Sequence, residues 1–157
     1  MTPVVRKATL DDLPTLLAFE QELIVAERLF DPTIKEDPVR YYDIAELITS
    51  SESEVYLIEI DEVIVASGYA KIKTDRHYLK HDKQGYLGFM YVSEAHRGKQ
   101  FNSLIIDALL AWCQSRHVFE ICLDVYQDNS SAVKAYEKVG FKKHMINMRM
   151  TIENRDF

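Results

Sequence analysis

Between an apolar run and an amphipathic segment, the chain reads Ser93-Glu94-Ala95-His96-Arg97-Gly98-Lys99-Gln100-Phe101-Asn102-Ser103. The preceding run, Tyr86–Val92, has the length and composition of a buried strand. After it, apolar side chains recur at helical spacing from Phe101 to Trp112. A strand that leads through a glycine-containing loop into a helix presents unpaired amide donors, which favour a phosphate or pyrophosphate. Arg97 and Lys99 add positive charge beside them.

A second informative segment follows closely, Leu123-Asp124-Val125-Tyr126-Gln127-Asp128-Asn129-Ser130-Ser131-Ala132-Val133-Lys134-Ala135-Tyr136-Glu137-Lys138-Val139-Gly140-Phe141. Ile121–Val125 is rich in β-formers and predicts a short strand. The apolar positions after Asn129 predict a helix, and Gly140 is a natural left-handed terminator for it.

Outward from these segments, the apolar periodicity predicts further strands and helices. These are a strand at Val4–Ala8, a helix from Leu13 to about Arg28, a helix at Tyr41–Thr49, a hairpin of Val55–Ile60 and Val63–Lys73, and one or two strands within Phe141–Met150. This order predicts an α/β protein with a mixed sheet covered by helices.

Composition and charge exclude several classes of protein. The 157 residues are 47% apolar and 28% charged, which fits one globular domain spanning residues 1–157 and argues against disorder. No run approaches the roughly 18 apolar residues of a membrane span, and the N-terminus shows no signal-peptide pattern. The net charge of −6 disfavours a nucleic-acid binder. With only Cys113 and Cys122, we expect a reduced, cytoplasmic location without a disulfide framework.

Together the two segments resemble the acetyl-CoA-binding core of the GNAT N-acetyltransferases. The family pattern of Asn, Ala, Tyr and Gly-Phe is matched by Asn129, Ala132, Tyr136 and Gly140-Phe141. Upstream, Met90-Tyr91-Val92 and Arg97-Gly98-Lys99 match the end of a strand and the cofactor loop, at the expected distance. The resemblance covers residues 85–144. It implies a GNAT fold, with about six to seven strands and four helices, and acetyl-CoA as cosubstrate.

The resemblance also implies where the cofactor lies. Acetyl-CoA would occupy a gap where the strands Tyr86–Val92 and Ile121–Val125 splay apart, with Asn129 near the thioester. Pantetheine would bind backbone groups of Met90, Tyr91 and Val92, and pyrophosphate would bind the amides of Arg97, Gly98, Lys99, Gln100, Phe101, Asn102 and Ser103. Gln100 and Asn102 depart from the family, which has small residues there, so we expect weaker cofactor binding.

For catalysis, the resemblance implies direct attack of an amine on the thioester, without an acyl-enzyme. Tyr136 matches the general acid that protonates the leaving thiolate; the alternative is that it only fills the core. Some relatives place a carboxylate base on the strand where this chain has Tyr86. Others place it twelve residues before the tyrosine, which is Asp124 here; the alternative is an aspartate that bonds backbone.

The distribution of charge along the sequence indicates which kind of molecule accepts the acetyl group. Residues 1–65 carry 15 acids and 5 bases, a net of −10, whereas residues 66–157 carry 10 acids and 14 bases, a net of +4. A cationic amine would be attracted to the acidic half and would stack on aromatic rings there, although the two tyrosines of that group could equally fill the core. The acids are Glu20, Glu22, Glu27, Asp31, Glu36 and Asp37; the rings are Phe30, Tyr41 and Tyr42.

Several functions remain open from the sequence. The leading prediction is acetyl transfer to a primary amine, carried by a small molecule or by a protein or peptide. The alternatives are a non-catalytic acyl-CoA sensor or interaction module and an anion-binding scaffold. The scattered histidines and cysteines predict no metal site, and membrane and nucleic-acid partners are not expected. Homodimerisation, common among relatives, is a further expectation for which no interface is marked.

Overall fold

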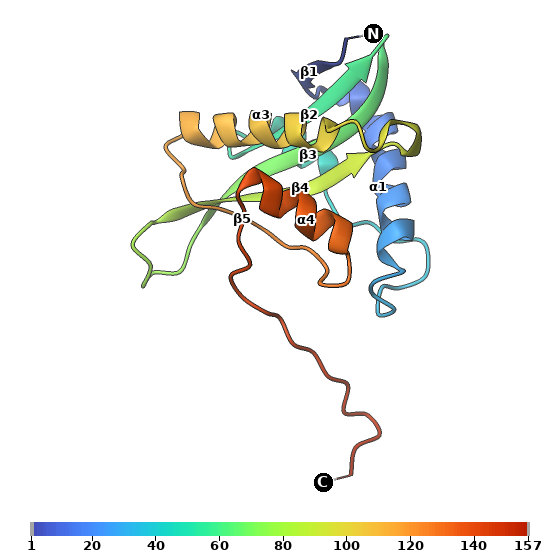
Figure 1. Ribbon diagram of the computed structural model, residues 1–157, viewed down its shortest axis with the longest axis vertical. Coiled ribbons are helices and arrows are strands. Elements are labelled where there is room, and N and C mark those ends of the chain that lie inside the picture. The colour runs from blue at the N-terminus through green and yellow to red at the C-terminus, as the bar shows by residue number, and fades with distance from the viewer. Residues whose placement is uncertain (1, 157) are drawn as a thin grey trace.

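The computed structural model describes residues 2–156 and contains one mixed sheet with helices on both of its faces (Figure 1). The strands are β1 (Val4–Lys7), β2 (Ser53–Ile60), β3 (Val63–Thr74), β4 (Lys83–Val92) and β5 (Ile121–Leu123), in that spatial order. The helices are α1 (Leu13–Glu27), α2 (Ile44–Thr49), α3 (Phe101–Ser115) and α4 (Ser130–Val139), with short 3₁₀ turns at Leu10–Asp12 and Glu94–His96.

The strands pair antiparallel from β1 to β4, and β5 joins β4 in parallel. This confirms the predicted mixed sheet. The parallel pair is possible because α3 crosses the sheet between β4 and β5, as parallel neighbours require a long connection.

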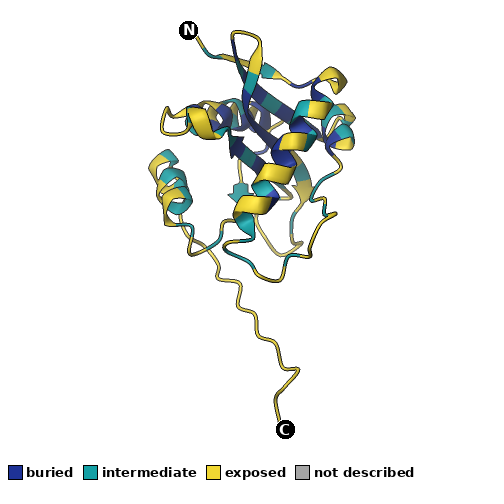
Figure 2. Ribbon diagram, turned by 90° about the vertical axis from the view of Figure 1, so that its right-hand side faces the viewer, coloured by how far each residue is buried: buried dark blue, intermediate teal, exposed yellow. Residues whose placement is uncertain are grey.

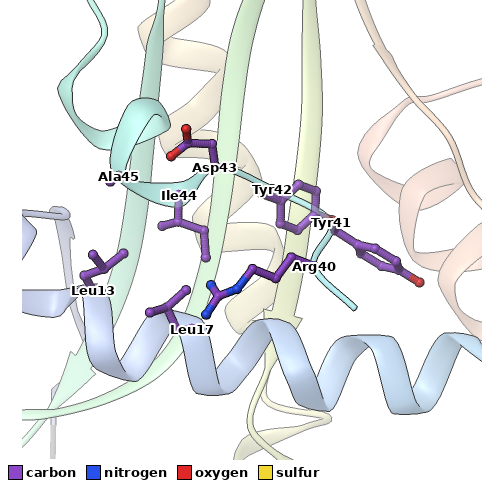
Figure 3. Close-up of a pocket in the computed structure, with 8 residues that line it drawn as sticks. All are labelled: Leu13, Leu17, Arg40, Tyr41, Tyr42, Asp43, Ile44 and Ala45. Carbon is purple, nitrogen blue, oxygen red and sulfur yellow. The ribbon is translucent and has the colours of Figure 1, made fainter. Parts of the chain in front are cut away.

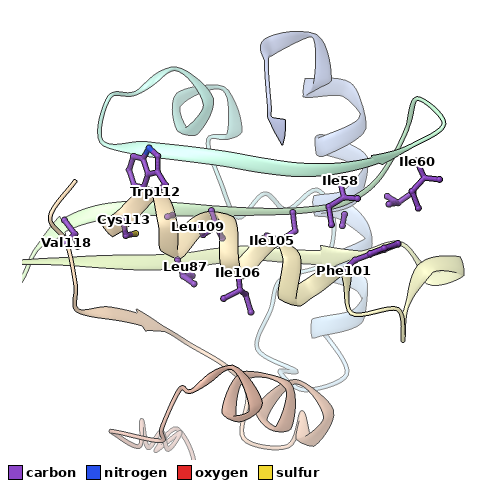
Figure 4. Close-up of a cluster of buried hydrophobic side chains, with 13 residues drawn as sticks. Ile58, Ile60, Leu87, Phe101, Ile105, Ile106, Leu109, Trp112, Cys113 and Val118 are labelled. Carbon is purple, nitrogen blue, oxygen red and sulfur yellow. The ribbon is translucent and has the colours of Figure 1, made fainter. Parts of the chain in front are cut away.

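Two apolar clusters hold the helices on the sheet. On one face α3 lays Ile105, Ile106, Leu109 and Trp112 across β2, β3 and β4 (Figure 4). On the other face, a second cluster joins α1 and α2 to the sheet; it comprises Ala8, Leu16, Phe19, Ile44, Leu47, Val55, Leu57, Tyr69, Phe89 and Tyr91. Buried residues therefore concentrate around β2, β3 and the two longer helices (Figure 2).

Gly68 sets how closely α3 approaches the sheet. A Cβ atom at this position would lie 2.6 Å from Ile105 Cγ2 and 2.7 Å from Met90 Sδ. No side chain fits at such distances, so the glycine in β3 permits the close contact of helix and sheet.

Local signals explain where α1 and α2 begin. Pro14 occupies the first turn of α1, where its missing N–H costs nothing. Arg6 of β1 donates two hydrogen bonds of 2.8 Å to the carboxylate of Asp12, which lies just before that helix. Asp43 caps α2, because its Oδ1 accepts a hydrogen bond from Glu46 N at 3.1 Å.

Three predicted boundaries are corrected by the structure. Phe141–Met150 forms no strand, so the described sheet has five strands rather than six or seven. The segment alternates apolar side chains but has no neighbouring strand in its own chain. The strand predicted at Ile121–Val125 ends at Leu123, where it separates from β4, and the helix predicted from Tyr41 starts at Ile44. Within residues 2–156, none of the helices is long and apolar enough to cross a membrane.

Candidate active site

A wedge opens between β4 and β5. The two strands pair at only three positions, Gly85 with Ile121, Tyr86 with Cys122 and Leu87 with Leu123. β4 then continues to Val92, whereas β5 ends, so none of residues 2–156 forms a strand on that side of β4 beyond Leu87. An unpaired strand edge offers amide and carbonyl groups to an extended ligand.

A bulge in β4 shapes this edge. The register with β3 shifts between Ser67, opposite Tyr91, and Tyr69, opposite Gly88. Phe89 lies within the shift at φ = +54°, a left-handed conformation that costs free energy in a residue other than glycine. Bulges of this kind end pairing and redirect the chain, and they gather beside active sites.

The residues predicted to bind pantetheine lie on this part of β4. Their side chains are engaged in packing: the Tyr91 ring contacts Phe19 with centroids 4.6 Å apart, and Met90 and Val92 pack against the α3 cluster. The side chains of Met90, Tyr91 and Val92 therefore fix the strand, and any ligand contact falls to the backbone.

The loop between β4 and α3 presents six consecutive amides, those of residues 98 to 103. Within the described part of the chain, none of them donates a hydrogen bond to a protein acceptor. Gly98 and Gln100 have positive φ angles of 79° and 63°, an arrangement that turns successive amides toward one concavity. The start of the 15-residue helix α3 adds its dipole, so the loop forms an anion cradle.

The side chains around the cradle take different roles. Arg97 folds back, and its Nε donates to Val92 O at 3.0 Å, which braces the end of β4. Three residues of the loop are exposed: Gly98, whose φ is +79°, Lys99 and Gln100. Phe101, in contrast, is buried beneath the loop. Asn102 and Ser103 are half-buried in the first turn of α3. Gln100 thus adopts a glycine-like backbone conformation while keeping its side chain outside the core.

Tyr136 lies within α4, and Asn129 immediately precedes that helix. Asn129 caps the helix, because its Oδ1 accepts from Ala132 N at 3.3 Å. Tyr136 is half-buried against the α3 cluster, with its ring 6.0 Å from that of Phe141. Burial, and secondarily the negative charge of Glu27, raise the pKa of Tyr136 to about 12. The phenol therefore keeps its proton at neutral pH and is available as a donor.

Asp124 lies just after β5 and is joined across the wedge to β4. The Tyr86 hydroxyl donates to Asp124 Oδ2 at 3.0 Å, so the partner of the carboxylate is a phenol rather than backbone. Burial, followed by the charge of Asp124, raises the pKa of Tyr86. Lys73 Nζ lies 4.1 Å from the centre of the Tyr86 ring. No role for Tyr86 was predicted from the sequence, because only the parallel register of β4 and β5 reveals this contact.

Comparison with known proteins identifies the family. Residues 20–141 match the model of the acetyltransferase (GNAT) family, which covers most of the chain. The chain belongs to the GNAT acetyltransferase family. Members of this family use acetyl-CoA as cosubstrate.

The individual proteins that are similar to this chain include acetyltransferases. An uncharacterized N-acetyltransferase, YobR of Bacillus subtilis (strain 168), is 35% identical over 60 residues, which are 38% of this chain and 24% of that protein. A point mutant of the BH1408 protein from Bacillus halodurans superimposes with a TM-score of 0.83 at 20% identity, over 94% of this chain and 98% of the other. A predicted acetyltransferase from Clostridium acetobutylicum, solved with acetyl-CoA, gives 0.73 at 18% identity, over 96% and 97%.

Several acidic side chains of the N-terminal half already bind other groups of the protein. Glu20 is fully buried, and its Oε2 accepts from the amides of Tyr41 and Tyr42 at 3.0 and 2.8 Å. Asp37 pairs with Arg28 at 3.0 Å. Glu20 and Asp37 therefore organise the segment between α1 and α2 and do not serve as free receptors for a cation, contrary to expectation.

Asp31 and Tyr126 connect the end of α1 to the loop after β5. The Tyr126 hydroxyl donates to Asp31 Oδ2 at 3.1 Å, and the Phe30 and Tyr126 rings stack with centroids 6.0 Å apart. Asp31 also accepts from Thr33 N at 2.9 Å. This contact brings the acidic segment to the side of the wedge where β5 ends.

Glu27 is the half-buried acid of this region that faces the site. Burial raises its pKa, and its charge in turn raises the pKa values of Tyr41, Tyr126 and Tyr136. The charge of Glu27 also raises the pKa of Tyr42. A side-chain hydrogen bond with Tyr41 partly opposes the rise in the pKa of Glu27 and adds to the rise in the pKa of Tyr41.

A separate surface hollow lies between α1 and the start of α2. Leu13, Leu17, Arg40, Tyr41 and Ile44 are among the residues that line it (Figure 3). Among residues 2–156, no group of three or more His, Cys, Asp or Glu side chains is placed to hold a metal ion.

Proposed function

We propose that this protein transfers the acetyl group of acetyl-CoA to a primary amine of a small cationic molecule, by direct attack. The observation that carries the proposal is the combination of a wedge beside β4 with six unpaired amides at its end. The wedge suits the extended pantetheine arm, and the amides suit the pyrophosphate.

In the proposed reaction, the lone pair of the amine nitrogen attacks the thioester carbonyl carbon. The C–S bond of the resulting tetrahedral intermediate breaks, and the electron pair leaves on sulfur. Tyr136, which remains protonated because its pKa is raised to about 12, donates to this thiolate. The proton lost by the nitrogen passes to Asp124, directly or through a water. Tyr86 holds the carboxylate at the wedge through its 3.0 Å hydrogen bond.

The acceptor is assigned from Glu27 and its aromatic neighbours. A half-buried carboxylate attracts a cation more strongly than a solvated one, and phenol rings stabilise ammonium groups. Tyr41 and Tyr126, whose pKa values Glu27 raises, supply such rings. A small diamine fits this arrangement, with one nitrogen neutral for attack and the other charged beside Glu27.

Release of free thiol from acetyl-CoA tests the proposal. We expect turnover with diamines and aminoglycosides, and slower turnover with amino acids and with peptides bearing free N-termini. Binding of CoA without thiol release for any amine would establish an acyl-CoA sensor instead. Equal competition by ATP and CoA would establish an anion-binding scaffold.

The variant Glu27→Gln tests the acceptor assignment separately. Loss of the charge should raise KM for a diamine about 10-fold, equivalent to about 1.4 kcal/mol, and leave KM for acetyl-CoA unchanged. Glu22→Gln, on the exposed side of the same helix, is the matched control and should leave both constants unchanged. Equal effects of the two substitutions would contradict a specific role for Glu27.

A further inference from the structure

Tyr69 of β3 lies across Gly88 of β4. The two residues are opposite each other in the antiparallel register. A Cβ atom at position 88 would lie 2.6 Å from both Tyr69 Cζ and Tyr69 Oη, so the end of the phenol fills the space that a side chain at this position would take. The φ angle of Gly88 is not in the left-handed region, so glycine is needed here for space and not for backbone conformation.

Gly88 lies at the closed end of the wedge. Leu87, the residue before it, forms the last pair with β5, opposite Leu123. The anion cradle lies at the other end of this stretch of β4, beyond Val92. Given the proposed function, on which this inference rests, a pantetheine arm that runs along β4 from the cradle brings its thioester end toward the bulge at Phe89 and toward Gly88.

Other aromatic rings hold Tyr69 in position. Tyr42 contacts the Tyr69 ring edge-on, with centroids 5.5 Å apart, and the Tyr86 ring lies 6.4 Å from it. The Tyr42 ring packs in turn against Phe89, with centroids 5.3 Å apart. Tyr69 is only 7% exposed and belongs to the apolar cluster on the face that carries α1 and α2. A ring that is buried and contacted in this way is not free to turn aside for a ligand.

Tyr86 and Asp124 close the same end of the wedge from the side of β5. Tyr86 lies two residues before Gly88, so its side chain extends on the face of the sheet that the Tyr69 ring covers. Its hydroxyl donates to Asp124 Oδ2 at 3.0 Å and so joins β4 to the chain after β5. Burial, followed by the charge of Asp124, raises the pKa of Tyr69, which agrees with a phenol close to this carboxylate. Tyr69 and the contact of Tyr86 with Asp124 therefore bound the closed end together.

We propose that Tyr69 limits the length of the acyl group that the protein accepts from acyl-CoA, because it occupies the space over Gly88 into which a longer chain would extend. An acetyl group carries one methyl beyond its carbonyl carbon. A butyryl group carries two further methylenes, which would have to displace a buried ring, and overpacking of this kind is unfavourable. Tyr69 is thus a specificity-determining residue for the cosubstrate and takes no part in the chemical step.

Binding to the wild-type chain tests the proposal without any substitution. In calorimetry we expect butyryl-CoA to bind at least about 10-fold more weakly than acetyl-CoA, the low end of the effect of an ill-fitting methylene. CoA itself, which has no acyl group, should bind about as tightly as acetyl-CoA. Equal dissociation constants of acetyl-CoA and butyryl-CoA would overturn the proposal even if acetyl transfer proceeds. Absence of CoA binding would instead contradict the proposed function as a whole.

Substitutions at position 69 test whether the ring is the cause. Tyr69→Val keeps a strand-forming residue but removes the ring. It should reduce the difference between the two acyl-CoA compounds to less than about 3-fold, both in dissociation constant and in kcat/KM for thiol release. Tyr69→Phe retains the ring over Gly88 and should keep the wild-type difference.

Tyr56→Val is the matched control. It shortens a half-buried tyrosine of β2 that packs on the opposite face of the sheet, against the α3 cluster, and it should keep the wild-type preference for acetyl-CoA. An unchanged preference in Tyr69→Val, or the same loss of preference in Tyr56→Val, would refute the assignment. If Tyr69→Val does not fold, the comparison of acetyl-CoA with butyryl-CoA on the wild-type chain still decides.

Discussion

Tyr136 packs in the core, and we propose that it also donates a proton; the sequence left these two roles as alternatives. It packs against the α3 cluster, and burial and Glu27 raise its pKa to about 12. A phenol with so high a pKa does not ionise at neutral pH, so it remains available as a donor. Packing and donation are compatible because the ring and the hydroxyl use different parts of the side chain.

Replacing Tyr136 by Phe tests the donor role directly. We expect kcat to fall at least 10-fold, at the low end of general acid contributions, because the thiolate would leave without a proton donor. The dissociation constant of CoA should change little, since the ring is retained. Steady-state kinetics and calorimetry measure the two effects, and unaltered turnover would remove Tyr136 from the mechanism.

Asp124 and Tyr86 form the second residue pair with a defined chemical expectation. Asp124→Asn should lower kcat/KM about 100-fold at pH 6, and the deficit should shrink as the pH approaches the amine pKa near 10. At high pH the amine is already neutral, so a base is needed less. Tyr86→Phe, which removes only the 3.0 Å hydrogen bond, should give a smaller loss with the same pH trend. A loss independent of pH would contradict the assignment of the base.

At the scale of elements, the loop before α3 shows how a departure from the family pattern is accommodated. Gln100 adopts φ = +63°, and the amides of residues 98 to 103 stay unpaired despite its side chain. The expected crowding is therefore limited to the exposed side chain, and the backbone cradle is intact. The strain of the left-handed conformation remains.

Gln100→Gly should relieve that strain. We expect the free energy of unfolding to rise by about 0.5–1 kcal/mol, measured by urea denaturation, and CoA to bind a few-fold more tightly. Ala111→Gly, at an exposed position in the interior of α3, is the control and should destabilise by about 1 kcal/mol. Destabilisation by both substitutions would show that the conformation at position 100 is unstrained.

The junction between β1 and α1 should make stability depend on pH. Hydrogen bonds from Arg6 lower the pKa of Asp12, and burial only partly opposes this. A carboxyl group whose pKa is lowered by folding stabilises the folded state above its unfolded pKa, and this contribution is lost as the pH falls through its folded value. Asp12→Asn should therefore cost about 2 kcal/mol at pH 7 and progressively less below pH 3.8. Thermal unfolding of this variant and of the exposed control Asp11→Asn measures the difference, and a constant cost across pH would contradict it.

The structure confirmed some of the predicted helices and strands and contradicted others, for identifiable physical reasons. The helix from Leu13 to about Arg28 and the hairpin of β2 and β3 were predicted because periodicity and turn residues act locally. The strands expected within Phe141–Met150 were wrong: the alternation is present, but alternation alone does not form a strand, and this segment pairs with none of the strands of residues 2–156. The contact of Tyr86 with Asp124 could not be predicted, because it depends on the parallel register of β4 and β5.

For the whole molecule, the charge asymmetry seen in the sequence has a partly structural origin. Several acids of residues 1–65 hold local structure: Glu20 binds two backbone amides, Asp12 binds Arg6 and Asp37 binds Arg28. The net charge of residues 1–65 therefore overstates how strongly this half of the chain attracts a cation. Glu27, beside Tyr136, is the acid whose position retains that interpretation.

The missing side chain at Gly68 links the sheet to the anion cradle. Ile105 and Met90 converge on it, one from the helix that carries the cradle and one from the strand that borders the wedge. A Cβ atom there would force Ile105 or Met90 to move, because both lie within 3 Å of its position. A shift of Ile105 would carry α3 with it, and a shift of Met90 would disturb β4, so any substitution at position 68 should change how the loop before α3 lies relative to the free edge of β4.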